Sequence, residues 1–239
     1  KPWITNIHTL NCVDMFHVPY DEVTDEQYYK GKITEHATNF GLGADHLQEI
    51  FLKGDAGVRV SLKECQELIA RKFAARPGIL DWQQAIREEA LMTRKLVSAW
   101  GVELDLTYER PGVDLWRRCY AWKPQADEAR HLNLLGLVPT WQYIQDQGYK
   151  SKINLQVHDA LVFSLRPEEA YDIVQFCVRS LEQERDYYGV PLVIPCSIKC
   201  GLTWMGSQEW QQLPTEEVFM EGVTTIMEGS HDTNAACRD

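Results

Sequence analysis

The sequence predicts an α+β fold in which a mostly helical N-terminal half precedes strands that pair in antiparallel fashion. Three observations support this prediction. Apolar residues recur at helical intervals between positions 79 and 97, as on one face of a helix. Apolar and polar residues alternate from 153 to 157, which is typical of a strand. A helix that begins at Pro167 then separates this strand from a further strand at 190–200.

Helical patterns dominate the N-terminal half. The stretches with helical spacing are 9–16, 28–40, about 60–73 and the clearer helix that follows the Pro77-Gly78 pair. The apolar stripe of that last helix consists of Ile79, Trp82, Ile86, Ala90 and Val97, and we expect Gly101 to end it. Residues 102–108 then alternate loosely, as in a strand.

The C-terminal half mixes helices with strands. A helical segment runs from about 125 to 145, and Pro139 inside it should kink or split the helix. Strand 153–157 and the apolar residues 160–163 form a hairpin pattern with His158-Asp159 at its bend. A helix with a buried stripe from Ala170 to Leu181 follows, closed by Gly189. From about 213 the chain is acidic and turn-rich, as in a tail.

The composition fits a folded protein rather than a disordered or membrane protein. Of the 239 residues, 44% are hydrophobic. No apolar run approaches the roughly 18 residues of a membrane span, and no signal peptide opens the chain, so we expect no membrane partner and a cytoplasmic location, in the host cell if the protein is viral. The seven cysteines lack a CxxC pair and are expected to be reduced core thiols. Lys1 in place of Met suggests a fragment or a processed product.

The net charge of −11 argues against a general nucleic-acid-binding surface. A function on nucleic acid would therefore depend on local basic groups, or on a basic segment outside these residues.

Asp159 is the first candidate for chemistry. A carboxylate on a tight turn between two apolar strands is held firmly and projects into solvent. Proteins present Mg²⁺ with such a group, together with phosphates and waters. The alternative is an ordinary turn residue, because Asp is common at turns.

The second candidate group is Lys32, His36 and Phe40. Their spacing of four places the side chains along one face of a helix. A cation, a titratable imidazole and an aromatic ring suit a nucleoside triphosphate. The alternative is an ordinary amphipathic helix with Phe40 in the core.

The strings around these residues resemble those of family A DNA polymerases. LQVHDALVF, the Pro-Glu-Glu helix, the VPL strand and the final Gly201-Leu202-Thr203-Trp204 resemble motif C and the end of that family. KITEHATNFGLG resembles motif B in its phage version. The resemblance implies mostly helical fingers followed by part of an antiparallel-sheet palm, which together form an incomplete polymerase right hand.

The resemblance also implies roles for the candidate residues. Asp159 would bind the catalytic Mg²⁺ ions, and His158 would lie near the primer terminus. Lys32 would contact the triphosphate, His36 would donate a proton to the leaving pyrophosphate, and Phe40 would stack on the nucleotide. Two positions depart from the common family pattern: Ala160 replaces a glutamate, and Ala44 replaces a tyrosine.

Weaker matches suggest contacts with DNA. Pro124 and Gln125 resemble the start of a palm helix whose glutamine touches the minor groove of the primer–template. Arg117 or Arg118 would contact a phosphate just before it, although both could equally be solvated. Near the N-terminus, Ile7-His8-Thr9 resembles a stretch that follows motif A, and it helps to fix the register.

Motif A itself is not found in these residues. Two-metal nucleotidyl transfer needs two Mg²⁺ ions held by carboxylates from different strands. We therefore expect the second carboxylate and the thumb to come from an N-terminal polymerase segment or subunit, and the chain alone to be inactive. The expected substrates are dNTPs and primer–template DNA.

The expected domains are fingers at 1–117 with the motif B helix at about 28–44, a C-terminal palm with the motif C hairpin at 118–212, and an acidic tail at 213–239. Two other functions stay open at this point. One is a fragment of a single-subunit RNA polymerase, which shares the His-Asp hairpin and the lysine-bearing helix. The other is a non-catalytic subunit that binds nucleotide or DNA, or that stabilises a partner.

Overall fold

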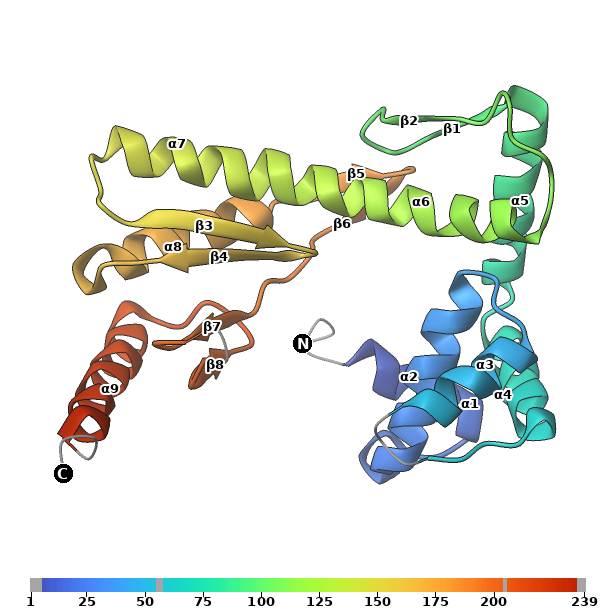
Figure 1. The fold of residues 1–239 in the computed structure, drawn as a ribbon, viewed down its shortest axis with the longest axis horizontal. Coiled ribbons are helices and arrows are strands. Elements are labelled where there is room, and N and C mark those ends of the chain that lie inside the picture. Colours follow the sequence, from blue (N-terminus) through green and yellow to red (C-terminus); the bar gives the residue numbers. More distant parts are fainter. Residues whose placement is uncertain (1–5, 55–57, 204–205, 236–239) are drawn as a thin grey trace. The chain divides into compact units, whose positions relative to one another are not determined.

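The computed structural model describes residues 6–54, 58–203 and 206–235 (Figure 1). The chain divides into two compact units, 1–126 and 127–239. The division was predicted between 117 and 118. Helix α6, Val113–His131, is continuous across both the predicted position and the division between the two compact units.

The first unit is mainly helical. Its elements, besides the first part of α6, are α1 (Ile7–Phe16), a short 3₁₀ turn (Tyr20–Glu22), α2 (Asp25–Asn39), α3 (Ala44–Lys53), α4 (Leu62–Ala75), α5 (Gly78–Thr93), β1 (Lys95–Val97) and β2 (Glu103–Asp105). Helices α1 to α4 pack around one apolar cluster that includes Met15, Leu47 and Phe51. A second cluster joins α5, β1, β2 and α6 around Leu96 and Tyr120.

The second unit combines helices with antiparallel strand pairs. Its elements, after the end of α6, are a π-helical segment (Leu132–Leu137), α7 (Val138–Asp146), β3 (Lys152–Val157), β4 (Ala160–Ser164), α8 (Pro167–Leu181), β5 (Arg185–Tyr187), β6 (Val190–Leu192), β7 (Ile198–Cys200), β8 (Gln208–Trp210) and α9 (Glu216–Ala235). The β3–β4 hairpin and α8 both contact the π-helical segment and α7 (Figure 1). The described strands form four antiparallel pairs, β1–β2, β3–β4, β5–β6 and β7–β8, so the predicted α+β class is confirmed.

The N-terminal helices agree with the hydrophobic pattern except where a helix ends. The helix expected at 28–44 ends at Asn39, and a separate helix begins at Ala44. The stripe that begins at Ile79 was expected to include Val97, but α5 ends at Thr93 and Val97 lies on β1. Arg94, the residue after α5, adopts a left-handed backbone conformation, and the helix ends there. The apolar spacing in the sequence continues past this point, into β1.

Pro139 lies in the first turn of α7, directly after the π-helical segment. A proline lacks the N–H that a helix interior needs, and it is tolerated in a first turn. Pro139 was expected to kink or split the helix, but the helical run continues through it, and the residues before α7, Leu132–Leu137, form a π-helical segment.

Two expectations in the last third were wrong. The strand expected at 190–200 is divided into β6 and β7, which pair with different partners; Pro195, with no N–H for a ladder, lies between them. The stretch expected to be an acidic tail without a pattern contains α9. Phe219 and Val223 of α9 are buried against Ala170, Val174 and Val178 of α8.

Three other sequence expectations concern membrane spans, cysteines and the end of the matched strings. Within the described ranges, no helix is long and apolar enough to cross a membrane. The cysteines described by the structure carry free thiols. Trp204, which belongs to the Gly-x-x-Trp string, lies outside the described residues.

Close packing of α1 on α2 depends on Gly31. A methyl group there would lie 2.4 Å from the Cys12 sulfur, well inside contact distance. Gly78 is also the site of a helical glycine, at the start of α5, but a methyl group there would meet no atom within 4 Å.

We therefore expect Gly31→Ala to lower the free energy of unfolding by about 1–3 kcal/mol, because α1 must move away from α2. Gly78→Ala is the matched control and should raise it by up to about 1 kcal/mol through helix propensity alone. Urea unfolding followed by circular dichroism measures both. Equal effects of the two substitutions would contradict the close approach.

Candidate nucleotide and metal site

Helix α2 presents Lys32 and His36 on its exposed face. Its first turn is fixed by a capping box, in which the Thr24 and Gln27 side chains bond reciprocally to each other's backbone N–H. Its opposite face consists of small buried side chains: Gly31, Thr34, Ala37 and Thr38. Because that face is buried against its neighbours, the rotation of α2 is fixed, and Lys32 and His36 point to solvent.

The charges on α2 are not equally neutralised. Lys30, on the side toward α4, pairs with Glu26 and Glu64 at 2.7 Å each. Lys32 is exposed and forms no ion pair with any residue that the structure describes. A strongly charged ammonium without a carboxylate partner is available for an anionic ligand.

His36 lies beside a second histidine that the sequence analysis did not assign to the site. The ring centroids of His8 and His36 are 5.1 Å apart, and Nδ1 of His8 lies 2.9 Å from a carboxylate oxygen of Glu35. The side chains of His8 and Glu35 are only 20% and 16% exposed. The Ile7-His8-Thr9 string could have indicated His8, but it was used only to align the sequence with the family motifs.

These neighbours change the titration of His36. Partial burial of the ring, and next the nearby His8, lower the pKa of His36 below its usual value; Lys32 acts in the same direction, and Glu35 opposes it. A bound phosphate would favour the imidazolium. The ring is therefore mostly neutral when free near pH 7, and it gains a proton more readily when an anion binds.

Phe40 lies just beyond the end of α2 and not on its face. It is the C-cap residue, and Gly41 follows with φ of +77°, a left-handed conformation that glycine adopts without strain. The half-buried Phe40 ring packs against the cluster that contains Ile86 and Tyr120. The core alternative is thus partly correct for Phe40: one part of the ring packs in the core, and the remainder stays accessible.

The β3–β4 hairpin presents His158 and Asp159 at a two-residue turn, as predicted. Val157 pairs with Ala160, so the two residues between them make the whole connection. His158 adopts φ of +51°, which hairpin turns of this length require but which is uncommon for histidine. His158, Asp159 and Ala160 are all exposed.

A metal ion at this turn would have one protein carboxylate from the described part of the chain. No group of three or more His, Cys, Asp or Glu side chains there is arranged to hold a metal ion. One exposed carboxylate on a rigid turn fits Mg²⁺, which commonly takes one or two protein carboxylates and fills its other positions with phosphates and waters. Asp159 therefore fits as one ligand of such an ion but cannot form a complete site.

Three of the expected DNA contacts, Arg117, Arg118 and Gln125, lie along α6. Gln125 is exposed. Arg118 pairs with Glu109 at 2.8 Å, and Arg117 lies 3.8 Å from Asp114, with its Nε buried and unbonded among the described residues. The expected helix start at Pro124 was wrong, because α6 begins at Val113 and contains this proline.

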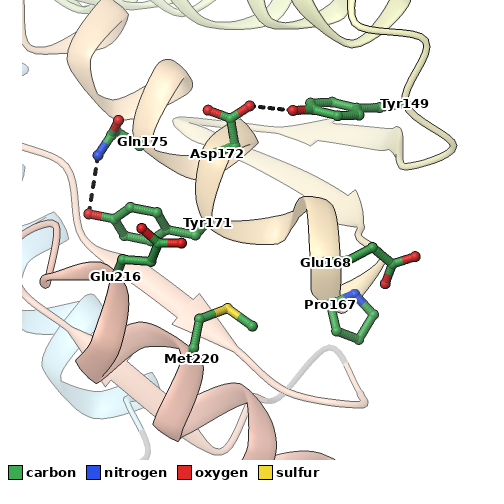
Figure 2. Close-up of a pocket in the computed structure, with 8 residues that line it drawn as sticks. All are labelled: Tyr149, Pro167, Glu168, Tyr171, Asp172, Gln175, Glu216 and Met220. Carbon is green, nitrogen blue, oxygen red and sulfur yellow. Dashed lines mark hydrogen bonds between the residues drawn. The ribbon is translucent and has the colours of Figure 1, made fainter.

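A cavity of about 350 Å³ lies in the second unit, between α8 and α9 (Figure 2). Asp172 accepts hydrogen bonds from the hydroxyls of Tyr143 and Tyr149. The hydrogen bond between Tyr143 and Asp172 raises the pKa of Tyr143 to about 12. Gln175 donates to the Tyr171 hydroxyl at 3.1 Å. No residue of the predicted site lines this cavity. Its wall includes the first turn of α8, which follows β4 at the end of the hairpin away from Asp159.

Comparisons with known proteins agree with this arrangement. Residues 4–206 match the model of DNA polymerase family A. The chain is 25% identical over 203 residues to a DNA polymerase I of Pseudomonas aeruginosa, covering 83% of the chain and 21% of that protein. It is 28% identical over 210 residues to a DNA polymerase I of Caldicellulosiruptor bescii, covering 83% and 23%. The chain thus spans about a fifth of the length of these relatives.

A solved structure shares the fold. It is the POL domain of Pol1 from M. smegmatis in complex with DNA primer-template and dNTP. The match has a TM-score of 0.67 at 23% identity and covers 78% of this chain and 32% of that chain. The α+β arrangement is therefore that of part of a polymerase domain.

The contact between His8 and His36 generates a prediction. His8→Ala should raise the pKa of His36, because it removes both a neighbouring ring that helps to bury His36 and the electrostatic effect by which His8 lowers that pKa. An NMR titration of the histidine ring protons measures this shift. His46→Ala, at an exposed position on α3, is the control and should leave the pKa of His36 unchanged. An unchanged or lower value in His8→Ala would contradict the proximity argument.

Proposed function

Because the chain belongs to DNA polymerase family A, we propose that it provides the nucleotide-binding helix and one metal-binding carboxylate of an enzyme that extends a DNA primer from dNTPs. The observation that carries the proposal is the exposed Asp159 on a two-residue hairpin turn inside the matched residues 4–206. In this assignment 1–117 acts as fingers, 118–212 as the C-terminal palm, and 213–239 as an additional acidic segment.

The exposed face of α2 binds the incoming nucleotide. Lys32 attracts the triphosphate, and its lack of a carboxylate partner among the described residues supports this role. His36 donates a proton to the pyrophosphate oxygen when the bond from the α-phosphorus to that oxygen breaks. The accessible part of the Phe40 ring stacks on the nucleotide. His8, next to His36, belongs to the same binding face.

Asp159 acts as one ligand for Mg²⁺. Two such ions would lower the pKa of the primer 3′ hydroxyl and neutralise the departing phosphates. The second carboxylate that they need is proposed to come from outside these 239 residues, from a polymerase segment or subunit that carries motif A and the thumb. His158, next to the ligand on the same turn, lies near the primer terminus.

Contacts with primer–template DNA are assigned to α6. Gln125 is exposed and able to donate to base edges in the minor groove. Arg118 can reach a phosphate only if it exchanges its Glu109 partner for the phosphate. Arg117 is more buried, so its contribution is mainly through the field of its charge. The net charge of −11 means that most DNA affinity would come from the partner segment.

The family match favours a DNA polymerase over the RNA polymerase fragment and the non-catalytic subunit. The phage type is proposed from the His-Ala-Thr-Asn-Phe string on α2. The cytoplasmic location stays a prediction.

Asp159→Asn should abolish primer extension in the completed enzyme, by at least about a thousandfold, because the amide keeps the shape of the turn but removes the charge that binds the metal. Glu184→Gln is the matched control, an exposed acidic residue of the same unit. Extension of a labelled primer, with circular dichroism to check the fold, measures the effect. A loss of only a few-fold would mean that Asp159 is an ordinary turn residue.

The chain alone should extend a primer at no more than background rate in Mg²⁺ and dNTPs. Addition of a polypeptide that carries motif A and the thumb of a family A polymerase should restore extension. The assay compares the chain, the added polypeptide and the mixture. Robust extension by the purified chain alone would refute the need for a second carboxylate from elsewhere.

A further inference from the structure

Two buried polar side chains from different helices contact the last turn of α2. Lys72 of α4 is 2% exposed, and Gln83 of α5 is 6% exposed. Buried lysine and glutamine side chains are uncommon unless they bond to a partner. Here both bind the end of the same helix, one residue before Phe40.

Gln83 bonds to backbone groups that the helix itself leaves open. The last carbonyls of a helix have no N–H partner in the following turn. The Gln83 amide donates to the carbonyl oxygens of Thr38 at 2.9 Å and Asn39 at 3.0 Å. The Gly41 N–H also donates to Thr38, and the Leu42 N–H donates to Ala37, both at 3.0 Å. The end of α2 is therefore held by its own chain and by α5.

Lys72 holds the same turn from the side of α4. Its Nζ donates to the Asn39 side-chain oxygen at 2.7 Å. A cation near a helix C-terminus is also favoured by the helix dipole. Lys72 and Glu35 line a small cavity of about 10 Å³, room for about one water molecule. Glu35 and Asn39 are four residues apart, so Lys72 faces one side of α2.

The contact comes with an electrostatic cost. Burial lowers the pKa of Lys72 from 10.5 to about 8, with Glu35 opposing this and Arg76 adding to it. An apolar side chain of similar length would fill the space without that cost, since buried charges are often replaced by apolar groups with no loss of stability. Because Lys72 bonds to Asn39, directly before Phe40, its role concerns the position of this turn and not only the stability of the fold.

We propose that Lys72 and Gln83 are positioning residues that fix the end of α2, and with it Phe40, for the incoming nucleotide. The inference rests on the proposed function of α2. Neither residue touches the nucleotide. Both act through Asn39 and Thr38, which set the direction of the chain where it leaves the helix at Phe40 and turns at Gly41.

The test uses the full chain and five single substitutions. Lys72→Met and Gln83→Leu remove the two contacts. Lys63→Met and Gln84→Leu are matched controls at exposed positions on the same two helices. Asn39→Ala removes the acceptor of Lys72 at a half-buried position, so it tests the same contact even if a core substitution prevents folding.

Three measurements follow for each variant: the melting temperature, the hydrogen exchange rates of the Gly41 and Leu42 amides, and the affinity for dATP in Mg²⁺. Lys72→Met, Gln83→Leu and Asn39→Ala should each speed the exchange at least tenfold and weaken dATP binding about tenfold. Lys72→Met should keep a melting temperature close to that of the wild type. The Lys72→Met and Asn39→Ala effects on affinity should not add, since both remove one contact.

Unchanged exchange in all three variants overturns the inference, whatever happens to nucleotide binding. Faster exchange with unchanged dATP affinity also overturns it, because Lys72 and Gln83 would then stabilise the end of α2 without affecting nucleotide binding. If the wild type itself binds no dATP, the proposed function of α2 fails, while the exchange measurements still decide whether Lys72 and Gln83 fix this turn.

Discussion

The arrangement of the first unit depends on the small buried face of α2. Gly31, Ala37 and two threonines allow α1 and α4 to approach the helix closely. At Gly31 even one methyl group would overlap the Cys12 sulfur. A helix held this closely cannot rotate about its axis, so the direction of Lys32 and His36 is set by packing on the opposite side of α2. The binding face is therefore a consequence of core packing and not of contacts among the exposed residues themselves.

The hairpin was predictable from the sequence because the information is local. A two-residue connection between alternating strands places Asp159 at the turn, and no distant contact is needed. One detail was not predictable. A register shift between Ile153 and Leu155 leaves Leu155 half exposed, although its alternation suggested a buried face. A bulge changes which side of a strand faces the core, and alternation alone does not reveal it.

The elements that were missed depend on distant residues. The carbonyl groups of Thr38 and Asn39 at the end of α2 accept hydrogen bonds from Gln83, which lies more than forty positions later in the sequence. The helical spacing of the sequence extends through Phe40, whereas α2 ends at Asn39. Likewise α9 has a weak pattern of its own, and it packs through Phe219 and Val223 onto a face of α8 that was identified only as a buried stripe. His8 was missed because its contact with His36 joins two helices.

A histidine at position 36 brings a different electrostatic behaviour from a lysine. A lysine would be charged whether or not nucleotide is present, whereas partial burial and His8 keep the pKa of His36 low in the free chain. Binding of a triphosphate changes that balance, because phosphate charge favours the imidazolium. The imidazolium is thus present to donate a proton to the leaving pyrophosphate when the nucleotide is bound. The positive charge that attracts the nucleotide in the first place must then come from Lys32, which is exposed on the same face of α2.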